Sequence, residues 1–309
     1  MKRFKNILFF ADGTEQADHA LERAFLLAEN NHARLTLLDV IEPIDIPRDI
    51  TDRFEFDLQE MLTQQRLEQL EELADPYRSS DNLIYAKVLV GKAFIEVIKA
   101  VISHRYDLVI KSARCCDGLS DRLLGSTDLH LLRKCPCPVW VDRPGADARY
   151  KRVLAAVDPM GQANDNCASL VMGLASSLAR REAAQLSVAH AWKMNGESML
   201  RDGRSRLSQS EFNLLINTTE MNHRVKLQAL LKNYGMATDD EAVHLIHGDA
   251  SRVIHQLSDD LNADLIVMGT VGRTGVPGLF IGNTAEDVLQ NAKASILAVK
   301  PSSFVSPVK

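Results

Sequence analysis

The 309-residue sequence predicts an α/β protein made of two tandem, open parallel-sheet domains. Three observations carry this prediction. The length suits two domains of roughly 100–200 residues each. Short β-branched or Leu-rich runs alternate with longer stretches of helical period, which indicates the strand–helix units of a parallel sheet. The whole pattern occurs twice, so we place one domain at residues 1–143 and the other at 149–301, joined by the breaker-rich linker Arg143–Asp147.

Each copy opens on a basic residue and an apolar strand that ends in aspartate. Lys5–Asp12 corresponds to Lys151–Asp158 at a shift of 146 residues, whereas Tyr106–Ile110 corresponds to Ala263–Val267 at a shift of 157. The change of shift places about eleven additional residues between the second and third strands of the second copy. The polar segment 195–209 is the expected position of this insertion, as a loop.

The remaining elements follow from their patterns. Continuous apolar strands such as 265–268 are typical of a sheet covered on both faces. Helices are expected at 17–29 and 164–180. Ser208–Glu211 forms a capping box, which predicts the start of another helix. The apolar faces expected on the two long helices comprise Leu58, Met61, Leu62, Leu70 and Leu73 in the first copy, and Phe212, Leu215 and Ile216 in the second.

Composition excludes several classes of protein. A net charge of −5 provides no general basic field for nucleic acid. The longest apolar runs, such as 7–11, are far shorter than the ~20 residues of a membrane span, and no export signal is visible, so we expect a cytoplasmic location. Five cysteines, an odd number, argue for reduced thiols rather than a disulfide framework.

A glycine-rich segment, Met268–Thr284, follows a buried-type strand and precedes a helix. A strand, a glycine loop and a helix N-terminus together favour phosphate binding, because exposed N–H groups and the helix dipole attract an anion. The spacing matches neither the Walker A motif nor the dinucleotide fingerprint. The alternative is that these glycines serve only the turn.

Gly269 and Gly272, followed after nine residues by Gly282-Asn283, resemble the G-2x-G-9x-G-(S/T/N) signature of ATP-binding universal stress proteins. The resemblance covers nearly the whole chain, and the block 131–140 is similar to the tandem, two-domain E subgroup of that family. It implies Rossmann-like domains of the adenine-nucleotide alpha-hydrolase type, with ATP, with or without Mg²⁺, across the carboxyl ends of the strands.

The resemblance also implies which residues contact the nucleotide. Adenine and ribose would lie against the ends of the first and second strands, and the phosphates against the glycine loop and the following helix. For Asp158 the alternative role is a turn or a cap. The implied contact residues are Ala156, Val157, Asp158, Ala191, Met268, Gly269, Gly272, Arg273, Gly282, Asn283 and Thr284.

The first copy departs from this motif. Ser112 and Cys115 stand where the second copy has its first two glycines, and Lys111 replaces Met268, although Gly125 and Asp12 persist. Side chains at the two lost glycines would obstruct a phosphate, so we predict that the first domain does not bind ATP in the family manner. Lys111, Arg114 and Arg122 could attract another anion, but solvated loop charges are the preferred interpretation.

Cysteines and histidines are expected to pack rather than to bind metal. Neither Cys115-Cys116 nor Cys135-Pro136-Cys137, even with His130, has the spacing of a common zinc site. His244 and His247 lie three apart in a strand and face opposite sides. His190 ends a strand near the expected site, where it could contact a ligand or simply pack.

No motif places a nucleophile, a base or a metal, so we expect no catalytic and no metal-binding residues. We predict a stress-response protein that binds an adenine nucleotide in its second domain and acts through nucleotide-dependent interactions. Two alternatives stay open: an interaction or scaffold protein without nucleotide, and a weak ATPase.

Partners follow from the duplication. Relatives often pair through their last strand, so we expect the strands at 139–141 and 296–299 to pair within the chain as a pseudo-dimer. A further homodimer stays open. We expect no nucleic acid and no membrane as partners, and the sequence identifies no protein partner.

Overall fold

The computed structural model describes residues 4–13, 19–44, 57–79, 83–113, 125–143, 149–161, 166–201, 207–270 and 282–309. The first copy contains β1 (Asn6–Phe10), α1 (His19–Asn31), β2 (Arg34–Ile41), α3 (Leu58–Ala74), β3 (Ile84–Val90), α4 (Ala93–His104), β4 (Leu108–Ser112), α5 (Ser126–Lys134) and β5 (Val139–Asp142). The second contains β6 (Arg152–Ala156), α6 (Cys167–Glu182), β7 (Gln185–Trp192), α7 (Glu197–Arg201), α8 (Gln209–Leu231), β8 (Val243–His247), α9 (Ala250–Asp260), β9 (Leu265–Gly269), α10 (Asn283–Asn291) and β10 (Ser295–Val299). Short 3₁₀ turns follow α3 and α8, at Asp75–Tyr77 and Lys232–Tyr234.

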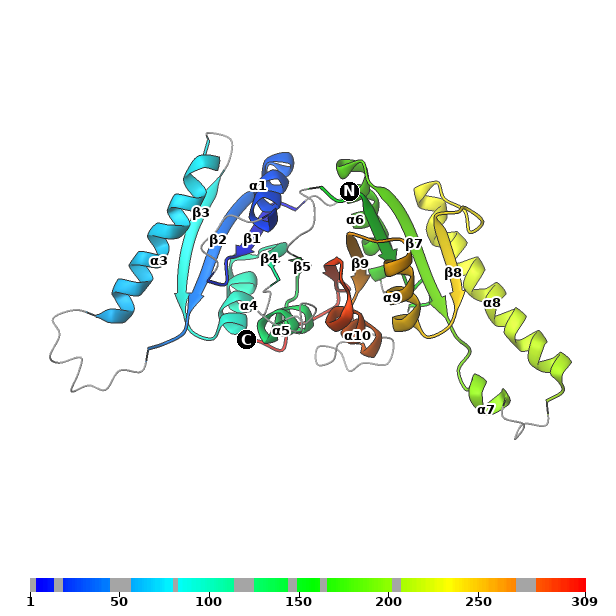
Figure 1. Ribbon diagram of the computed structural model, residues 1–309. Coiled ribbons are helices and arrows are strands. Elements are labelled where there is room, and N and C mark those ends of the chain that lie inside the picture. The colour runs from blue at the N-terminus through cyan, green and yellow to red at the C-terminus, as the bar shows by residue number, and fades with distance from the viewer. Residues whose placement is uncertain are drawn as a thin grey trace.

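The strands form one sheet in the order β3-β2-β1-β4-β5-β10-β9-β6-β7-β8 (Figure 1). Neighbours within each copy are parallel, and the copies meet where β5 and β10 pair antiparallel, with Trp140 opposite Leu297. The predicted α/β fold is confirmed, and so is the predicted pairing of the last strands. The pseudo-dimer is therefore a single continuous sheet.

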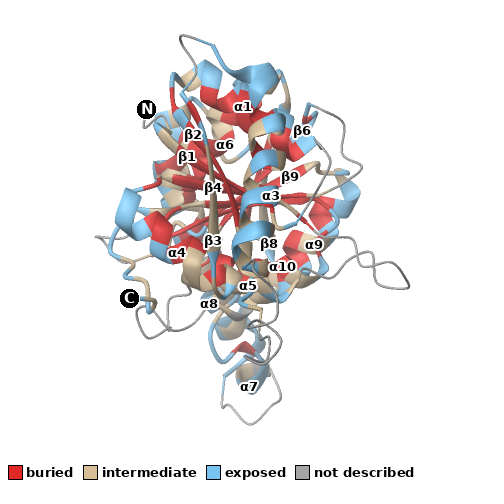
Figure 2. Ribbon diagram, turned by 90° about the vertical axis from the view of Figure 1, so that its left-hand side faces the viewer, coloured by how far each residue is buried: buried red, intermediate tan, exposed pale blue. Residues whose placement is uncertain are grey.

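Both faces of the sheet are covered, as the continuous apolar strands predict. In β1, Ile7 and Phe9 pack into a cluster with α1 and α3, whereas Leu8 and Phe10 pack into a second cluster with α4 and α5. The second copy repeats this division, with α6 and α8 on the first face and α9 and α10 on the other. Buried residues are concentrated along the strands between these layers (Figure 2).

The long helices α3 and α8 lie at the outer edges of the sheet and extend beyond it (Figure 1). Their buried residues are confined to the C-terminal halves, such as Leu70 in α3 and Leu227 in α8. Met61 and Leu215, predicted to belong to buried faces, are 49% and 40% exposed because their helical turns lie past the strands. The predicted capping box is confirmed, since Ser208 and Glu211 bond reciprocally.

The inserted segment of the second copy differs from the loop that its polar composition suggested. It contains the short helix α7, whose Glu197 is buried and bonds to His247 Nε2 through Oε2 at 2.8 Å. The contact between Glu197 and His247 ties α7 to the end of β8, although the sequence of the inserted segment has no helical periodicity. Among the helices of the described ranges, none combines the length and the apolar character needed to cross a bilayer.

A buried polar network joins the two copies behind the β5–β10 pair. Asp142 accepts hydrogen bonds from the hydroxyls of Tyr150 and Ser295, the latter at 2.8 Å. The Arg23 guanidinium lies 3.6 Å from the same carboxylate and stacks 3.7 Å from the Tyr150 ring centroid. Burial and the Asp142 charge raise the pKa of Tyr150 well above its usual value. The phenol therefore stays protonated as a donor.

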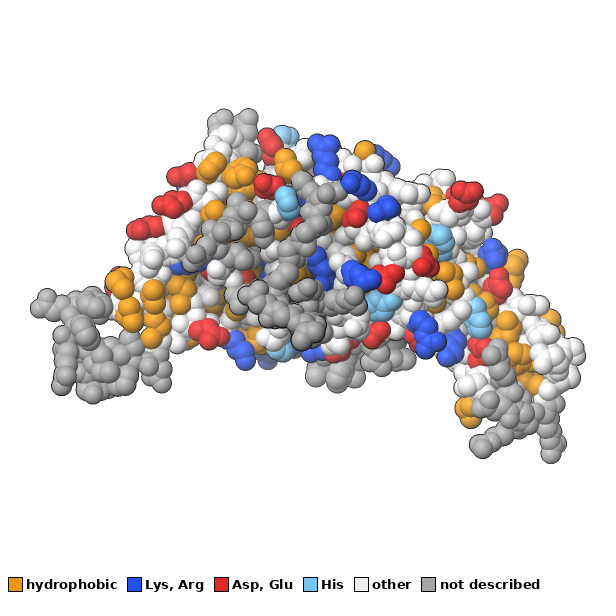
Figure 3. Space-filling model, viewed as in Figure 1, with side chains coloured by type: hydrophobic (Ala, Val, Ile, Leu, Met, Phe, Trp, Pro, Cys, Tyr) orange, Lys and Arg blue, Asp and Glu red, His pale blue; other side chains and the backbone are white. Residues whose placement is uncertain are grey.

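Charges on the surface are mixed in sign. On the face shown in Figure 3, basic and acidic side chains of the described residues are interspersed. This distribution accords with the small net charge of −5. That nucleic acid is not a partner stays a prediction.

Candidate functional site

The candidate site lies at the carboxyl ends of β6 and β9. These strands are parallel neighbours, with Ala156 opposite Met268. The chain leaves β6 toward α6 on one face of the sheet and leaves β9 toward α10 on the other. Where neighbouring connections diverge in this way, a parallel sheet leaves a crevice suited to a ligand. The fold thus brings together residues from both ends of the second copy.

The end of β6 places three of the predicted residues. Ala156 and Val157 are buried, and the Val157 N–H donates to Ala189 O at 2.9 Å. Asp158 is exposed, and its Oδ1 accepts the Met160 N–H at 3.1 Å. Asp158 therefore has the turn role that the sequence left open, at the rim of the crevice. Ala191 lies near the end of β7, partly exposed.

The end of β9 supplies Met268 and Gly269. Met268 is buried in the apolar cluster beneath the crevice, so its side chain supports the floor. A Cβ on Gly269 would lie 2.7 Å from Sγ of Cys167, the first residue of α6. Glycine is thus required here for packing against α6, in addition to the phosphate role predicted from the motif. Cys167 was not found by sequence reasoning, because the contact joins segments far apart in the chain.

Replacing Gly269 by alanine separates these two roles. We expect the clash with Cys167 to lower the free energy of unfolding by about 1–3 kcal/mol. Adding Cys167→Ala should restore stability, because it removes Sγ. Urea denaturation measures the stability, and titration with ATP measures whether Gly269 is needed for phosphate binding. If the stable double variant binds ATP like the parent, close approach at Gly269 is unnecessary; an undiminished stability of the single variant would contradict the packing role.

The N-terminus of α10 faces the same edge of the sheet. Gly282 is its N-cap residue, and its N–H donates to Thr270 O at 2.9 Å, which ties the helix start to the chain leaving β9. Thr284 lies in the first turn and is partly exposed. Glu286 pairs with Arg133 of α5 in the other copy. Gly272, Arg273 and the side chain of Asn283 lie outside the described residues.

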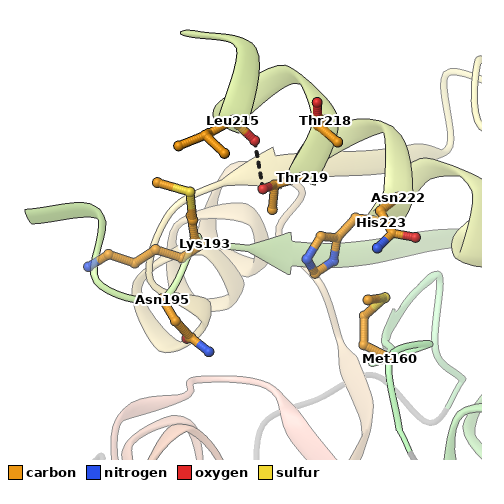
Figure 4. Close-up of a pocket in the computed structure, with 9 residues that line it drawn as sticks. Met160, Lys193, Asn195, Leu215, Thr218, Thr219, Asn222 and His223 are labelled. Atoms are coloured by element: carbon orange, nitrogen blue, oxygen red, sulfur yellow. Dashed lines mark hydrogen bonds between the residues drawn. The ribbon is translucent and has the colours of Figure 1, made fainter. Parts of the chain in front are cut away.

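A pocket of about 330 Å³ lies between Met160, which follows β6, the segment that follows β7, and α8 (Figure 4). Side chains of α8 form one wall, and Met160 and the segment after β7 form the others. The lining residues are Met160, Lys193, Met194, Asn195, Leu215, Thr218, Thr219, Asn222 and His223. Apolar side chains, amides and hydroxyls in one small pocket suit a polar, flat ligand group.

Two buried histidines connect the end of β6 with this pocket. A carbonyl can only accept, so His190 donates through Nδ1 to Val157 O at 3.0 Å. His190 Nε2 and His223 Nδ1 lie 2.8 Å apart and share one hydrogen bond. The side chain of His223 lines the pocket. His190 itself, 1% exposed, packs rather than lining the pocket.

His223 was missed in the sequence, although one signal could have revealed it. It lies four residues before the buried Leu227, on the buried face of α8. In the first copy Arg66 lies four residues before Leu70 in α3 and pairs with Asp39 of β2, as His223 pairs with His190 of β7. A polar residue on the buried face of a helix thus marks an internal polar partner in both copies.

In the first copy, charged side chains pair with one another at the corresponding strand ends. Lys111, predicted as an anion-attracting or solvated loop charge, lies within β4 and is 1% exposed. Its ammonium group lies 2.7 Å from Asp12 Oδ2 and also pairs with Asp128 of α5. Both interpretations of Lys111 are therefore wrong, because its charge is neutralised internally. Arg114 and Arg122, like Cys115 and Cys116, lie outside the described residues.

No group of three or more His, Cys, Asp or Glu side chains is placed to hold a metal ion in the described ranges. Cys135 and Cys137 are buried beside each other at the end of α5. His247 stacks against Trp192, with ring centroids 4.5 Å apart, and bonds to Glu197.

Comparison with known proteins bears on this site. The sequence profile of the universal stress protein family matches residues 3–143 and again 149–300. Universal stress protein E of Escherichia coli K12 is 29% identical over 320 aligned residues, covering all of this chain and 98% of that protein. A homologue from Haemophilus influenzae is 25% identical over 97% of this chain and 98% of its own length.

Solved structures resemble the chain over both copies. A Pseudomonas aeruginosa UCBPP-PA14 protein assigned to the universal stress proteins is 25% identical, with a TM-score of 0.73, covering 97% of this chain and 94% of that one. A protein of unknown function from Pseudomonas aeruginosa PAO1 is 24% identical, with a TM-score of 0.71 over 97% of this chain and 93% of its own.

Proposed function

Because the chain belongs to the universal stress protein family, with two copies in tandem, we propose that its second domain binds ATP. The observation that carries the proposal is the convergence at one crevice of the β6 end, the α10 N-terminus and the pocket. These three features supply a place for a ribose, a phosphate chain and a base, respectively.

In this proposal each part of the nucleotide has a neighbour in the second copy. The base enters the pocket under α8, where apolar side chains and amides line the walls. The ribose hydroxyls lie within reach of the Asp158 carboxylate at the rim. The phosphates lie toward Gly269, Gly282 and Thr284, where backbone N–H groups and the helix dipole favour negative charge. From the motif, Gly272, Arg273 and Asn283 are also expected to contact the phosphates, and Mg²⁺ can accompany the phosphates.

Binding, rather than hydrolysis, is the proposed activity. Phosphoryl transfer needs a placed metal ion and a residue that orients the attacking water, and the motif specifies neither. The bound nucleotide then governs interactions with a partner protein in a stress response. A scaffold without nucleotide and a weak ATPase are the competing functions. The cytoplasmic location and a further homodimer stay predictions.

Calorimetric titration with ATP tests the proposal, and the two copies provide a matched pair of variants. Gly282→Glu adds a carboxylate at the N-cap of α10, where it would repel the phosphates, and should weaken binding at least about 100-fold. Gly125→Glu makes the same change at the N-cap of α5 in the first copy and should leave the affinity unchanged. The expected stoichiometry is one ATP per chain.

The other outcomes separate the competing functions. Absence of saturable binding in the folded parent protein would favour the scaffold. ATP turnover that disappears in Gly282→Glu would favour the weak ATPase. Two equivalent sites per chain would contradict the prediction that the first copy does not bind ATP.

A further inference from the structure

Two thiols and a lysine are buried together where the two copies meet, and none of the three is among the residues predicted to contact the nucleotide. Cys135 is the C-cap residue of α5, and Cys137 precedes β5. Their Sγ atoms lie 3.5 Å apart in a hydrogen bond, and both residues are buried. Lys300, which follows β10 of the other copy, lies beside them and is 4% exposed.

The backbone between the thiols suits a covalent bond. Residues two apart in an extended chain place their side chains on one side, with Cα atoms about 6.6–7.2 Å apart, at the upper limit for a disulfide. Here the chain bends at Pro136 and Cys137, and the two Sγ atoms face each other at hydrogen-bond distance. The sulfur atoms need only to approach from 3.5 Å to the roughly 2 Å of a disulfide bond.

The lysine activates one thiol of the pair. Lys300 donates from Nζ to Leu132 O at 2.7 Å, which fixes its ammonium group at the C-terminus of α5. Burial lowers the pKa of Lys300 to about 8, against the opposing effect of the neighbouring thiols. Burial by itself would raise the pKa of Cys135, but the hydrogen bond with Cys137 and the charge of Lys300 lower it below the usual pKa of a cysteine. The pKa of Cys137 is instead raised well above the usual value, mainly by burial. The ammonium group lies at the end of α5, whose C-cap residue is Cys135, which favours Cys135 as the nucleophile and Cys137 as the thiol that resolves it.

We propose that Cys135 and Cys137 form an oxidation site that hydrogen peroxide converts to an intramolecular disulfide. The Cys135 thiolate attacks one peroxide oxygen, the O–O bond breaks, and sulfenic acid and hydroxide form. Cys137 then loses its proton, its sulfur attacks the Cys135 sulfur, and the second hydroxide leaves. The two protons and two hydroxides give two waters, and the two thiols supply the two electrons that peroxide gains. Peroxide, little larger than water, is the class of oxidant that can reach a buried pair.

One peptide reports on this site. Trypsin cleaves after Lys134 and Arg149 but not at the resistant Arg143–Pro144 bond, which gives the fragment 135–149. This fragment contains Cys135 and Cys137 and no other cysteine. After peroxide treatment of the folded protein and alkylation of free thiols, we expect this fragment to have lost two hydrogens and to take up no alkylating agent. Dithiothreitol should reverse the change.

Three variants assign the roles. Cys137→Ser should stop at sulfenic acid on residue 135, trapped by dimedone, and Lys300→Met should slow oxidation about tenfold for each unit by which the Cys135 pKa rises. Lys293→Met, the matched control at a lysine whose side chain is more than half exposed and pairs with Asp259, should leave the rate unchanged. A fragment that stays a dithiol, that goes directly to sulfinic acid, or that cross-links to Cys167 would overturn the proposal. These readouts do not depend on ATP binding.

Discussion

Replacing Asp142 by alanine is expected to lower the free energy of unfolding by about 3–5 kcal/mol. The carboxylate lies at the centre of the network between the copies and is 2% exposed. Its removal takes the nearer of two carboxylates from the buried Arg23 guanidinium, which keeps Glu182 at 3.9 Å, and deprives the hydroxyls of Tyr150 and Ser295 of their acceptor. A buried charge that loses its nearest partner costs far more than a lost surface contact.

Urea denaturation followed by circular dichroism measures this effect. The matched control is Asp259→Ala, which removes a carboxylate 3.0 Å from Lys293, where both side chains are more than half exposed. That change should alter stability by at most about 1 kcal/mol, because water solvates both charges. If the two variants lost similar stability, the network would not hold the copies together.

Lys111→Met is expected to cost about 3–5 kcal/mol, although methionine occupies the corresponding position, 268, of the second copy. The substitution leaves the carboxylates of Asp12 and Asp128 close to each other without the ammonium group that pairs with both. Like charges in a site of low dielectric repel strongly. The measurement is again the urea midpoint of the folded protein.

The second copy supplies the compensating change. It has Ala285 where the first copy has Asp128, so Lys111→Met with Asp128→Ala reproduces its apolar pair. This double variant should recover most of the lost stability, because a buried ion pair and a well-packed apolar pair have similar net free energies. A residual loss of about 0.5–2 kcal/mol is expected, since Asp128 also accepts the Gly125 N–H at the start of α5. A double variant less stable than Lys111→Met would contradict the ion-pair explanation.

Local pattern was enough to predict most of the fold. Apolar strands of four to eight residues, helical periods and the capping box at Ser208 each depend on neighbours in the sequence, and the structure confirms them. The repeat also predicted one long-range contact, because two copies of a unit that ends in a strand can pair through their last strands. β5 and β10 do so. Local pattern was insufficient for Met61 and Leu215, whose exposure depends on where the sheet ends.

The candidate site could be predicted only in part. The motif and the strand ends led to Asp158, Gly269 and Gly282, which the fold places at one crevice. His223 and Cys167 escaped prediction because their partners lie on other elements; the spacing of His223 before Leu227 indicates an internal polar partner but does not identify it. The pocket under α8 was likewise hidden, since its walls come from three separate segments.

The sequence by itself determined that this chain holds two copies of one α/β unit and that only the second keeps the glycine motif. Both conclusions follow from the order of residues along the chain alone. Only the tertiary structure decided the role of the lysine that stands at the corresponding strand end of the first copy. Lys111 became a buried ion-pair partner rather than a loop charge because folding brought Asp12 and Asp128 to its ammonium group. A charge's role depends on its neighbours in space and on its exclusion from water, and neither can be read from its place in the sequence.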